Sequence, residues 1–247
     1  DSVSEAFRII RTNMDFMRVK SEKLQVVMFT SANPGAGKTF VSSNLAMSIA
    51  QTNKKVVLVD VDIRKGTLSG IFSNSSNRMG LTHYLSGSTD KVDDIVGTSE
   101  EYEKLDVIFS GPVPPNPAEL LLSERFDRLI TELRKRYDYI IVDNVPAGIV
   151  ADASIVNRVV DLTIFVVRSG VMDRRQLPEL ENMYRQEQLH NLSVILNGVP
   201  SDHKGYGYGY GYGYGYGYGY GYGYGNDTHK HTKMSHVRKI LSRFWKR

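Results

Sequence analysis

The chain has 247 residues, with 31 Lys plus Arg against 27 Asp plus Glu, 41% hydrophobic residues and no Cys. This length suits one sizeable domain, or one domain with a tail. The lack of Cys excludes disulfide scaffolds, thiolate metal sites and cysteine nucleophiles. No apolar run approaches the roughly 20 residues of a membrane span and no signal-peptide pattern opens the chain, so we expect a soluble protein. The start at Asp1 rather than Met indicates a processed or truncated piece.

Positive charge is concentrated at the C-terminal end of the chain. Residues 226–247 hold seven Lys or Arg and one acid, so this end carries +6, and the 24 basic and 26 acidic residues before it leave the body at −2. Because the excess belongs to a short terminal segment rather than to a folded face, we expect no nucleic-acid partner.

The first predicted element is an amphipathic helix that presents Phe7, Ile10, Met14 and Met17 at spacings of three and four within residues 4–19. After it, short β-branched runs alternate with longer helical patterns, which predicts a doubly wound α/β domain with a mostly parallel sheet. The predicted strands are 25–29, 55–59, 105–109, 139–142, 162–167 and 193–196. The predicted crossover helices are 38–51, 123–137, 151–159 and 173–188.

The periodicity stops after Pro200, and a strict Tyr-Gly alternation follows. This repeat has too little side-chain variety to build a core, so we expect disorder. We therefore divide the chain into a globular domain, 1–200, a disordered Tyr-Gly repeat, 201–225, and a basic amphipathic tail, 226–247. The tail could lie on an anionic membrane surface or dock on a partner, and the alternative is a frayed chain end. Its His residues are too sparse to predict a metal site.

Between the first predicted strand and the next helix lies Ala32-Asn-Pro-Gly-Ala-Gly-Lys-Thr39, in the strand, glycine loop and helix order of a Walker A motif. Gly35 and Gly37 let backbone N–H groups close around phosphate oxygens, and the helix N-terminus adds partial positive charge. Lys38 reaches the β and γ phosphates, and Thr39 offers a hydroxyl to Mg²⁺. The alternative is a Gly-Pro turn that merely joins strand to helix. The predicted ATP-binding residues are Pro34, Gly35, Ala36, Gly37, Lys38, Thr39 and Phe40.

Two further predicted strands end in acids, at the edge of the sheet where ligands bind in doubly wound folds. Asp60, Asp62 and Arg64 form an Asp-x-Asp-x-Arg pattern, in which an extended segment would place both carboxylates on one side. A Walker B pattern ends at Asp143. Mg²⁺ prefers hard oxygen ligands and keeps several waters, so we predict a shell of Thr39 with Asp60 or Asp143, partly through water, which leaves Asp62 free for chemistry. For either acid alone, the alternative is an N-cap or a solvated strand end.

The order of these motifs resembles the bacterial protein-tyrosine kinases (BY-kinases) associated with capsule and exopolysaccharide export. The resemblance covers nearly the whole chain and includes segments 80–87 and 111–121, a Tyr-rich C-terminus and a Glu-x-x-Arg-x-x-Arg helix motif. The sequence departs from the family pattern in two places. Asp143-Asn-Val-Pro146 replaces the usual Asp-x-Pro-Pro, and a monotonous repeat replaces a loose tyrosine cluster.

The resemblance implies a P-loop NTPase-type fold and ATP-dependent transfer of a phosphoryl group to tyrosine with Mg²⁺, in the service of polysaccharide synthesis and export. A phenol with a pKa of about 10 is a poor nucleophile at neutral pH, so a carboxylate that accepts its proton is a sensible device. By motif position Asp62 is the predicted base. For Arg64 we expect a role in holding the acidic loop or in contacting phosphate, and the alternative is a surface ion pair. The predicted catalytic residues are Lys38, Asp60, Asp62, Arg64 and Asp143.

Glu5, Arg8 and Arg11 recur every three residues and are expected on the helical face opposite the apolar stripe. Alone, this pattern indicates a solvated charged face. The resemblance implies instead that these residues join neighbouring subunits into a ring, an octamer in the family. It also implies a membrane-spanning activator domain or subunit, a tyrosine phosphatase as a further partner, and a location on the cytoplasmic side of the bacterial inner membrane.

The tyrosines of the repeat are typical of a substrate, because glycine lets the chain lie extended in the cleft of another subunit. Complete modification would add on the order of −15 to −20 charges, expel the repeat and loosen the ring. The modified repeat could also pair with the basic tail. The alternative is an adhesive spacer. The predicted phosphoacceptors are Tyr206, Tyr208, Tyr210, Tyr212, Tyr214, Tyr216, Tyr218, Tyr220, Tyr222 and Tyr224.

Two other functions compete with a kinase. The closest is a Min/Par-type partition ATPase switch without kinase activity. That group is marked by a second lysine early in its phosphate loop, where this chain has Asn33, and it has no role for a tyrosine repeat. The third candidate is an inactive scaffold with an adhesive Tyr-Gly segment.

Overall fold

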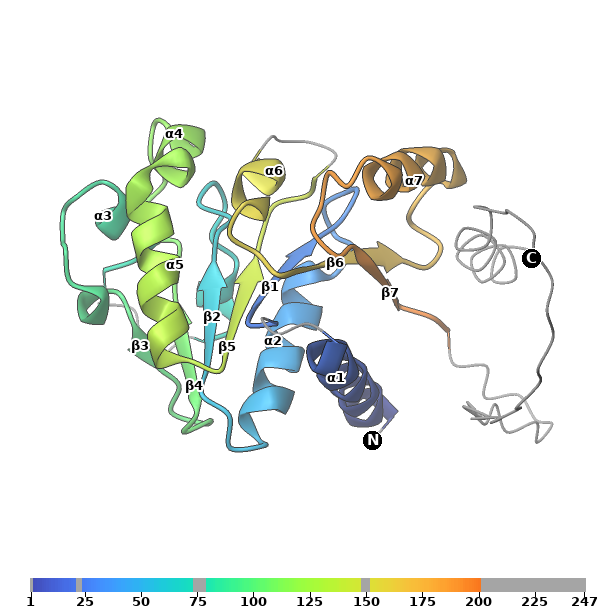
Figure 1. Ribbon diagram of the computed structural model, residues 1–247, viewed down its shortest axis with the longest axis horizontal. Helices are drawn as coiled ribbons and strands as arrows, with labels where there is room; N and C mark the ends of the chain where they lie inside the picture. Colours follow the sequence, from blue (N-terminus) through green and yellow to red (C-terminus); the bar gives the residue numbers. More distant parts are fainter. Residues whose placement is uncertain (1, 21–23, 73–78, 148–151, 201–247) are drawn as a thin grey trace, which may run out of the picture. The chain divides into compact units, whose positions relative to one another are not determined.

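A seven-stranded sheet forms the centre of the domain in the computed structural model, which describes residues 2–20, 24–72, 79–147 and 152–200 (Figure 1). The strand order is β3-β4-β2-β5-β1-β6-β7, with β3 antiparallel to β4 and every other neighbouring pair parallel. The predicted doubly wound, mostly parallel fold is therefore confirmed. The strands are β1 (Val26–Thr30), β2 (Val56–Asp60), β3 (Gly97–Thr98), β4 (Leu105–Ile108), β5 (Tyr139–Asp143), β6 (Leu162–Arg168) and β7 (Ser193–Asn197).

Helices follow the strands as crossover connections, after a first helix that precedes the sheet (Figure 1). The α-helices are α1 (Ser2–Lys20), α2 (Lys38–Ala50), α3 (Leu81–Leu85), α4 (Pro117–Leu122), α5 (Glu124–Arg136), α6 (Asp152–Asn157) and α7 (Leu177–Arg185). Among the described helices, none is long and apolar enough to cross a membrane. The predicted repeat and basic tail lie outside the described residues.

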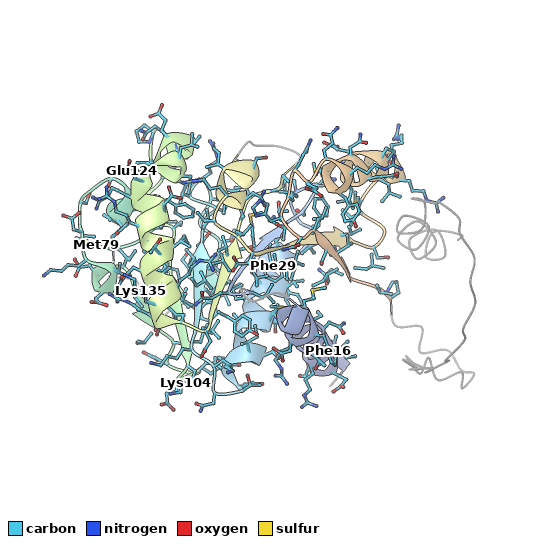
Figure 2. All side chains as sticks on the ribbon, in the orientation of Figure 1. Phe16, Phe29, Met79, Lys104, Glu124 and Lys135 are labelled. Atoms are coloured by element: carbon cyan, nitrogen blue, oxygen red, sulfur yellow. The ribbon has the colours of Figure 1, made fainter. Side chains whose placement is uncertain are left out.

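The strands bury alternate side chains on two different faces of the sheet. In β1, Val26 and Met28 join the core under α5, α6 and α7, whereas Val27 and Phe29 join the core under α1 and α2. The same alternation holds in β2, β5 and β6. Successive side chains of a strand point to opposite faces, so near-continuous apolar runs are what a sheet covered on both sides requires. Side chains fill the space on both sides of the ribbon around Phe29 (Figure 2).

Helix α1 packs against α2 through only part of its predicted apolar stripe. Phe7 and Met14 are buried and Ile10 is partly buried, but Met17 is 41% exposed. At 100° per residue, Met17 lies roughly 80° around the helix from Phe7, at the margin of the contact. The outer face carries Phe16, which is 61% exposed and points away from the sheet (Figure 2).

Glu5, Arg8 and Arg11 do not share one face of α1, and the prediction that they lie opposite the apolar stripe is wrong for Arg11. Arg11 lies roughly 40° from Phe7, on the inner side of the helix. Its Nη1 donates to the backbone oxygen of Ser48 in α2 at 2.7 Å. Glu5 and Arg8 are exposed and form an ion pair with each other at 3.1 Å.

Short elements are where the sequence prediction differs most from the structure. The sequence did not predict β3, α3 or α4, which contain two, five and six residues. The predicted helix 173–188 is divided into a 3₁₀ turn, Arg174–Gln176, and α7. Pro178 occupies the first turn of α7, where its missing N–H costs nothing, so the proline starts a new helix rather than continuing the old one.

A network of hydrogen bonds ties β1 to β6 at the amino edge of the sheet. The carboxylate of Asp161 accepts two hydrogen bonds from Arg134, at 2.7 and 2.8 Å, and two from the backbone N–H groups of Gln25 and Val26. The Asp161 side chain is only 16% exposed. One carboxylate therefore accepts hydrogen bonds both from the backbone at the start of β1 and from a side chain near the end of α5.

We expect Asp161→Ala to lower the free energy of unfolding by about 2 to 4 kcal/mol, because it leaves a half-buried guanidinium and two backbone donors without their acceptor. Urea denaturation measures this difference. Glu124→Ala is the matched control, because it removes an ion pair whose side chains are 67% and 86% exposed and should cost less than about 0.5 kcal/mol. Equal losses in the two variants would contradict the role given to Asp161.

Candidate nucleotide site

The glycine loop joins β1 to α2 in a conformation that exposes its backbone donors. Gly35 and Gly37 have φ values of +77° and +91°, in the left-handed region that favours glycine. Gly37 is the N-cap of α2, so the first turn of the helix offers N–H groups and the positive end of its dipole at this point. Among the residues that the structure describes, nothing lies within 4 Å of the place where a Cβ on Gly35 would stand. The loop is built to receive an anion.

Lys38 follows the loop and is half-buried between two acids. Burial lowers the pKa of its ammonium group, and the charges of Asp143 and Asp62 raise it in opposition. The ammonium group of Lys38 thus feels two carboxylates, Asp143 at the end of β5 and Asp62 in the loop after β2.

The ends of β2 and β5 place two acids side by side. Asp60 and Asp143 are paired in the parallel register, and both are buried. Thr39 donates to Oδ2 of Asp143 at 2.6 Å, and its hydroxyl also lies 3.1 Å from that of Thr67. The other oxygen of Asp143, Oδ1, is buried and has no hydrogen-bond partner among the described residues. A buried carboxylate oxygen in this state, next to a threonine hydroxyl, fits a hard cation such as Mg²⁺.

Asp60 is engaged by the loop that follows it. Its Oδ1 accepts from the backbone N–H of Asp62 at 3.2 Å, and its Oδ2 accepts from that of Leu68 at 3.1 Å. Burial raises the pKa of Asp60 to about 7 and that of Asp143 to about 6, with the Thr39 hydrogen bond and the Lys38 charge acting against the second shift. Both carboxylate oxygens of Asp60 thus fix the conformation of the loop after β2.

Asp62 lies at the start of a tight turn and is partly exposed. Its carboxylate accepts from the backbone N–H of Lys65 at 3.2 Å, and its backbone oxygen accepts from Gly66 at 2.9 Å. Arg64 is exposed at the outside of this turn. The two acids two residues apart therefore differ in environment: Asp60 is buried under the loop, and Asp62 is accessible at its surface.

Phe40 directs its ring toward α1. Its ring centroid lies 6.0 Å from that of Phe7, in an edge-to-face arrangement of 62°. Any contact of Phe40 with phosphate would therefore use its backbone N–H. Pro34 is exposed, and Ala36 is buried against the end of β6.

Three side chains that the sequence did not single out contact the loop from its outer side. Arg168 and Asn197 donate to the backbone oxygens of Gly35 and Ala36, at 2.9 and 3.0 Å. Gln176 pairs with the side chain of Asn33 through two hydrogen bonds, of 2.9 and 3.2 Å. Their positions at or after the ends of β6 and β7 were the available signal, because ligand sites of doubly wound sheets lie at that edge.

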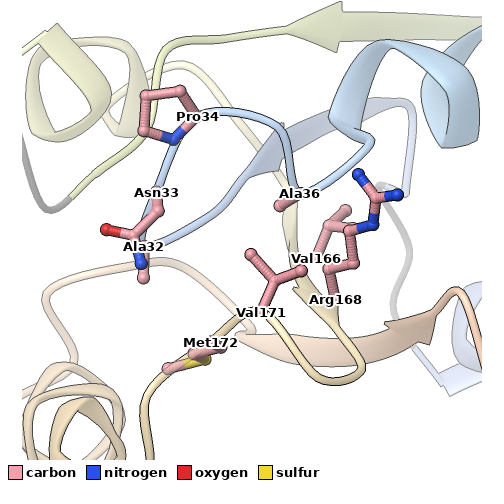
Figure 3. Close-up of a pocket in the computed structure, with 8 residues that line it drawn as sticks. All are labelled: Ala32, Asn33, Pro34, Ala36, Val166, Arg168, Val171 and Met172. Carbon is pink, nitrogen blue, oxygen red and sulfur yellow. The ribbon is translucent and has the colours of Figure 1, made fainter.

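A small pocket lies on the same side of the loop (Figure 3). It is lined by Ala32, Asn33, Pro34, Ala36, Val166, Arg168, Val171 and Met172. Together with the phosphate loop and the paired acids, this edge of the sheet defines a P-loop nucleotide-binding domain.

Comparison with known proteins narrows this class. The family model described as "AAA domain" matches residues 24–168. Tyrosine-protein kinase CpsD of Streptococcus pneumoniae is 38% identical over 193 residues, which are 78% of this chain and 83% of the relative. Tyrosine-protein kinase YwqD of Bacillus subtilis is 40% identical over 204 residues, 82% of this chain and 84% of the relative. The chain belongs to the bacterial protein-tyrosine kinase family.

Solved structures agree with this membership. The kinase domain of Escherichia coli tyrosine kinase ETK superposes with a TM-score of 0.74 at 37% identity, over 84% of this chain and 81% of that one. MinD of Pyrococcus horikoshii superposes with a TM-score of 0.56 at 21% identity, over 70% and 69%. The second likeness is one of fold alone, and the partition ATPase alternative is not favoured.

The raised pKa values predict an unusual dependence of stability on pH. A carboxyl group whose pKa is higher in the folded state binds protons more tightly there, so its contribution to stability is present below pH 3.8 and is lost as the pH rises through the folded value. Without metal or nucleotide, these acids should lower the free energy of unfolding between about pH 4 and 7, by about 1.4 kcal/mol per unit of pKa difference.

Urea denaturation at several pH values, comparing Asp60→Asn with the unmodified protein, measures the contribution of Asp60. The variant should flatten the decline, and Glu124→Gln, at an exposed site, should keep it. Parallel pH curves for Asp60→Asn and the unmodified protein would show that the pKa of Asp60 is the same in the folded and the unfolded state.

Proposed function

We propose that this domain binds ATP with Mg²⁺ and transfers the γ-phosphoryl group to tyrosines of its own C-terminal repeat, from one subunit to another. The observation that carries the proposal is the hydrogen bond from Thr39 to Asp143 beside Lys38, in the first turn of the helix that follows the glycine loop. Relatives at 38 to 40% identity bear the name tyrosine-protein kinase, which supports the choice of acceptor.

Binding divides among the residues of the strand ends. The N–H groups of residues 35–40 receive the phosphates, and Lys38 holds the charge that builds up on the transferred group. Thr39 and Asp143 hold the Mg²⁺, with Asp60 contributing directly or through water. When bound there, Mg²⁺ would neutralise part of the negative charge of the phosphates. Such a cation would also relieve the cost of keeping two buried carboxylates charged.

Asp62 acts as the general base of the transfer. Its accessible carboxylate takes the phenolic proton while the tyrosine oxygen bonds to the γ phosphorus and the bond to the bridging oxygen of ADP breaks. Asp60 is less suited to this step because backbone donors occupy both its oxygens. Arg64, at the outer side of the same turn, steadies the loop or meets the incoming phosphate.

The Tyr-Gly repeat supplies the acceptors. Residues 205–225 follow β7 in the sequence, and about 20 residues span at most about 70 Å when fully extended. A neighbouring subunit is therefore within reach. The negative charge gained on modification favours release of the repeat and loosening of the assembly.

Assembly uses the exposed side of α1. Glu5 and Arg8 are available there for a complementary surface on the next subunit, and repetition of a head-to-tail contact closes a ring, octameric by family resemblance. Arg11 contributes indirectly, because its side chain is engaged with α2. A membrane-spanning activator, a tyrosine phosphatase, and a site of action at the cytoplasmic face of the inner membrane in polysaccharide export complete the proposal.

The decisive test is intact-mass spectrometry of purified protein with Mg-ATP. We expect a ladder of additions about 80 Da apart confined to the Tyr-Gly peptide, and its absence in Lys38→Met, because the γ phosphate loses its charged partner. Asp62→Asn should keep nucleotide binding but lose transfer. Lys135→Met, which removes an exposed lysine on α5, is the control and should keep the ladder. Phosphate release with unmodified tyrosines would favour a Min/Par-type ATPase instead.

Arg8→Glu separates assembly from folding. The reversed charge faces solvent in the isolated domain, so the variant should fold normally yet give smaller species by light scattering. Arg128→Glu reverses an equally exposed charge on α5 and should leave the size unchanged. An intact ring in Arg8→Glu would refute the interface. Arg11→Glu is the weaker test, since it also disturbs the packing of α1 on α2.

A further inference from the structure

The outer side of the phosphate loop is held by side chains from the last third of the chain. Arg168 donates from Nη1 to the backbone oxygen of Gly35 at 2.9 Å, and Asn197 donates from Nδ2 to that of Ala36 at 3.0 Å. Two consecutive peptide units of the loop are thus held from one side. In Figure 3, Arg168 rises from the end of β6 beside Ala36.

The parallel pairing of β6 and β7 brings these two donors together. Arg168 and Asn197 are opposite each other in the register, and the backbone N–H of Ser169 donates to the Asn197 oxygen at 2.9 Å. Paired residues of neighbouring strands direct their side chains to the same face of a sheet. The end of the β6–β7 ladder therefore presents a guanidinium and an amide side by side, next to the loop.

The orientation of these contacts determines what the loop offers to a ligand. In a planar trans peptide, the C=O of one residue and the N–H of the next point in opposite directions. When Arg168 holds the Gly35 oxygen outward, the N–H of Ala36 points inward. When Asn197 holds the Ala36 oxygen outward, the N–H of Gly37 does the same.

Glycines make this external support necessary. Gly35 and Gly37 can adopt left-handed and right-handed backbone conformations at little cost, so the peptides between them are free to rotate unless they are held. The amide of Asn197 also occupies the space beside Gly37, since a Cβ there would lie 2.3 Å from Nδ2. Residue 37 is thus restricted to glycine by both its φ angle and this neighbour.

We propose that Arg168 and Asn197 are positioning residues that orient the loop N–H groups toward the phosphates and thereby set phosphate affinity, without contacting the base of the nucleotide. This inference rests on nucleotide binding by the loop, as in the proposed function, but not on transfer to tyrosine. A receptor whose donors are already oriented loses less free energy on binding than one that must order them. The two hydrogen bonds between Gln176 and Asn33 support the same loop two residues before Gly35.

The experiment compares ligands that carry only part of a nucleotide. Affinities of ATP, inorganic tripolyphosphate and adenosine are measured by competition with a fluorescent ATP analogue, for the full chain and for Arg168→Met and Asn197→Ala. We expect about 5- to 20-fold weaker binding of ATP and of tripolyphosphate in both variants, the range expected for one lost hydrogen bond to a charged or well-placed donor. Adenosine affinity should stay unchanged.

Two further variants exclude a merely structural effect. Arg168→Lys keeps one donor and a positive charge, and should recover part of the tripolyphosphate affinity. Arg128→Met makes the same kind of change at an exposed ion pair on α5 and should alter no affinity. If Arg168→Met does not fold, Asn197→Ala and Arg168→Lys carry the test alone.

Three results would overturn the proposal. Weaker ATP binding with unchanged tripolyphosphate binding would place Arg168 or Asn197 at the base. Unchanged affinity for all three ligands would mean that the loop holds its own orientation. Equal weakening of adenosine and tripolyphosphate would indicate general disorder of the site. A chain that binds tripolyphosphate but never modifies tyrosine would count against the kinase proposal and leave this one standing.

Discussion

The parallel pairing of β1 between β5 and β6, and of β5 with β2, is the constraint on which the site depends. It brings the phosphate loop after β1, Asp143 at the end of β5 and Asp60 at the end of β2 to the same edge of the sheet. The short contact from Thr39 to Asp143 then joins loop and acid. Because both faces of the sheet are buried, a slip of one residue would exchange the side chains that fill the two cores and disrupt the packing of both. The fold thus protects the spacing of the chemical groups through its packing.

The two acids of the Asp-x-Asp pattern illustrate how one strand end creates two environments. Asp60 lies within the buried sheet and accepts hydrogen bonds from the loop that follows, whereas Asp62 lies on that loop at the surface. A buried carboxylate suits a cation and an accessible one suits proton transfer to an incoming phenol. The difference comes from the point at which β2 ends, one residue into the motif.

The sequence predicts the parts of this structure that are encoded locally. The order of strand, glycine loop and helix identifies residues 32–39, and the acids that follow β-branched runs identify the strand ends. These predictions work because the residues lie close together in the chain. Arg168 and Asn197 could not be found in that way, because their contact with the loop depends on the pairing of β6 with β1 and of β7 with β6.

The errors of prediction have similar causes. Spacings of three and four place Met17 in the apolar stripe. Over ten residues, however, the rotation of the helix moves Met17 to the margin of the contact, and the same geometry places Arg11 on the inner side. The pair Gly97–Thr98 is too short to carry an alternating pattern, so β3 exists only because β4 offers it an edge. In the predicted helix 173–188, Pro178 marks the true beginning of α7. Helix rotation and a proline explain the first and last cases, and a neighbouring strand explains β3.

The packing of α1 on α2 also limits how the domain can be shortened. Phe7 and Met14 cover apolar surface on α2, and Phe7 covers the ring that directly follows the Walker threonine. A truncation that begins at β1 would expose this apolar surface of α2, including the ring of Phe40, to water. Deleting α1 is thus a poor route to a soluble shortened domain, since it would expose apolar surface that α1 covers.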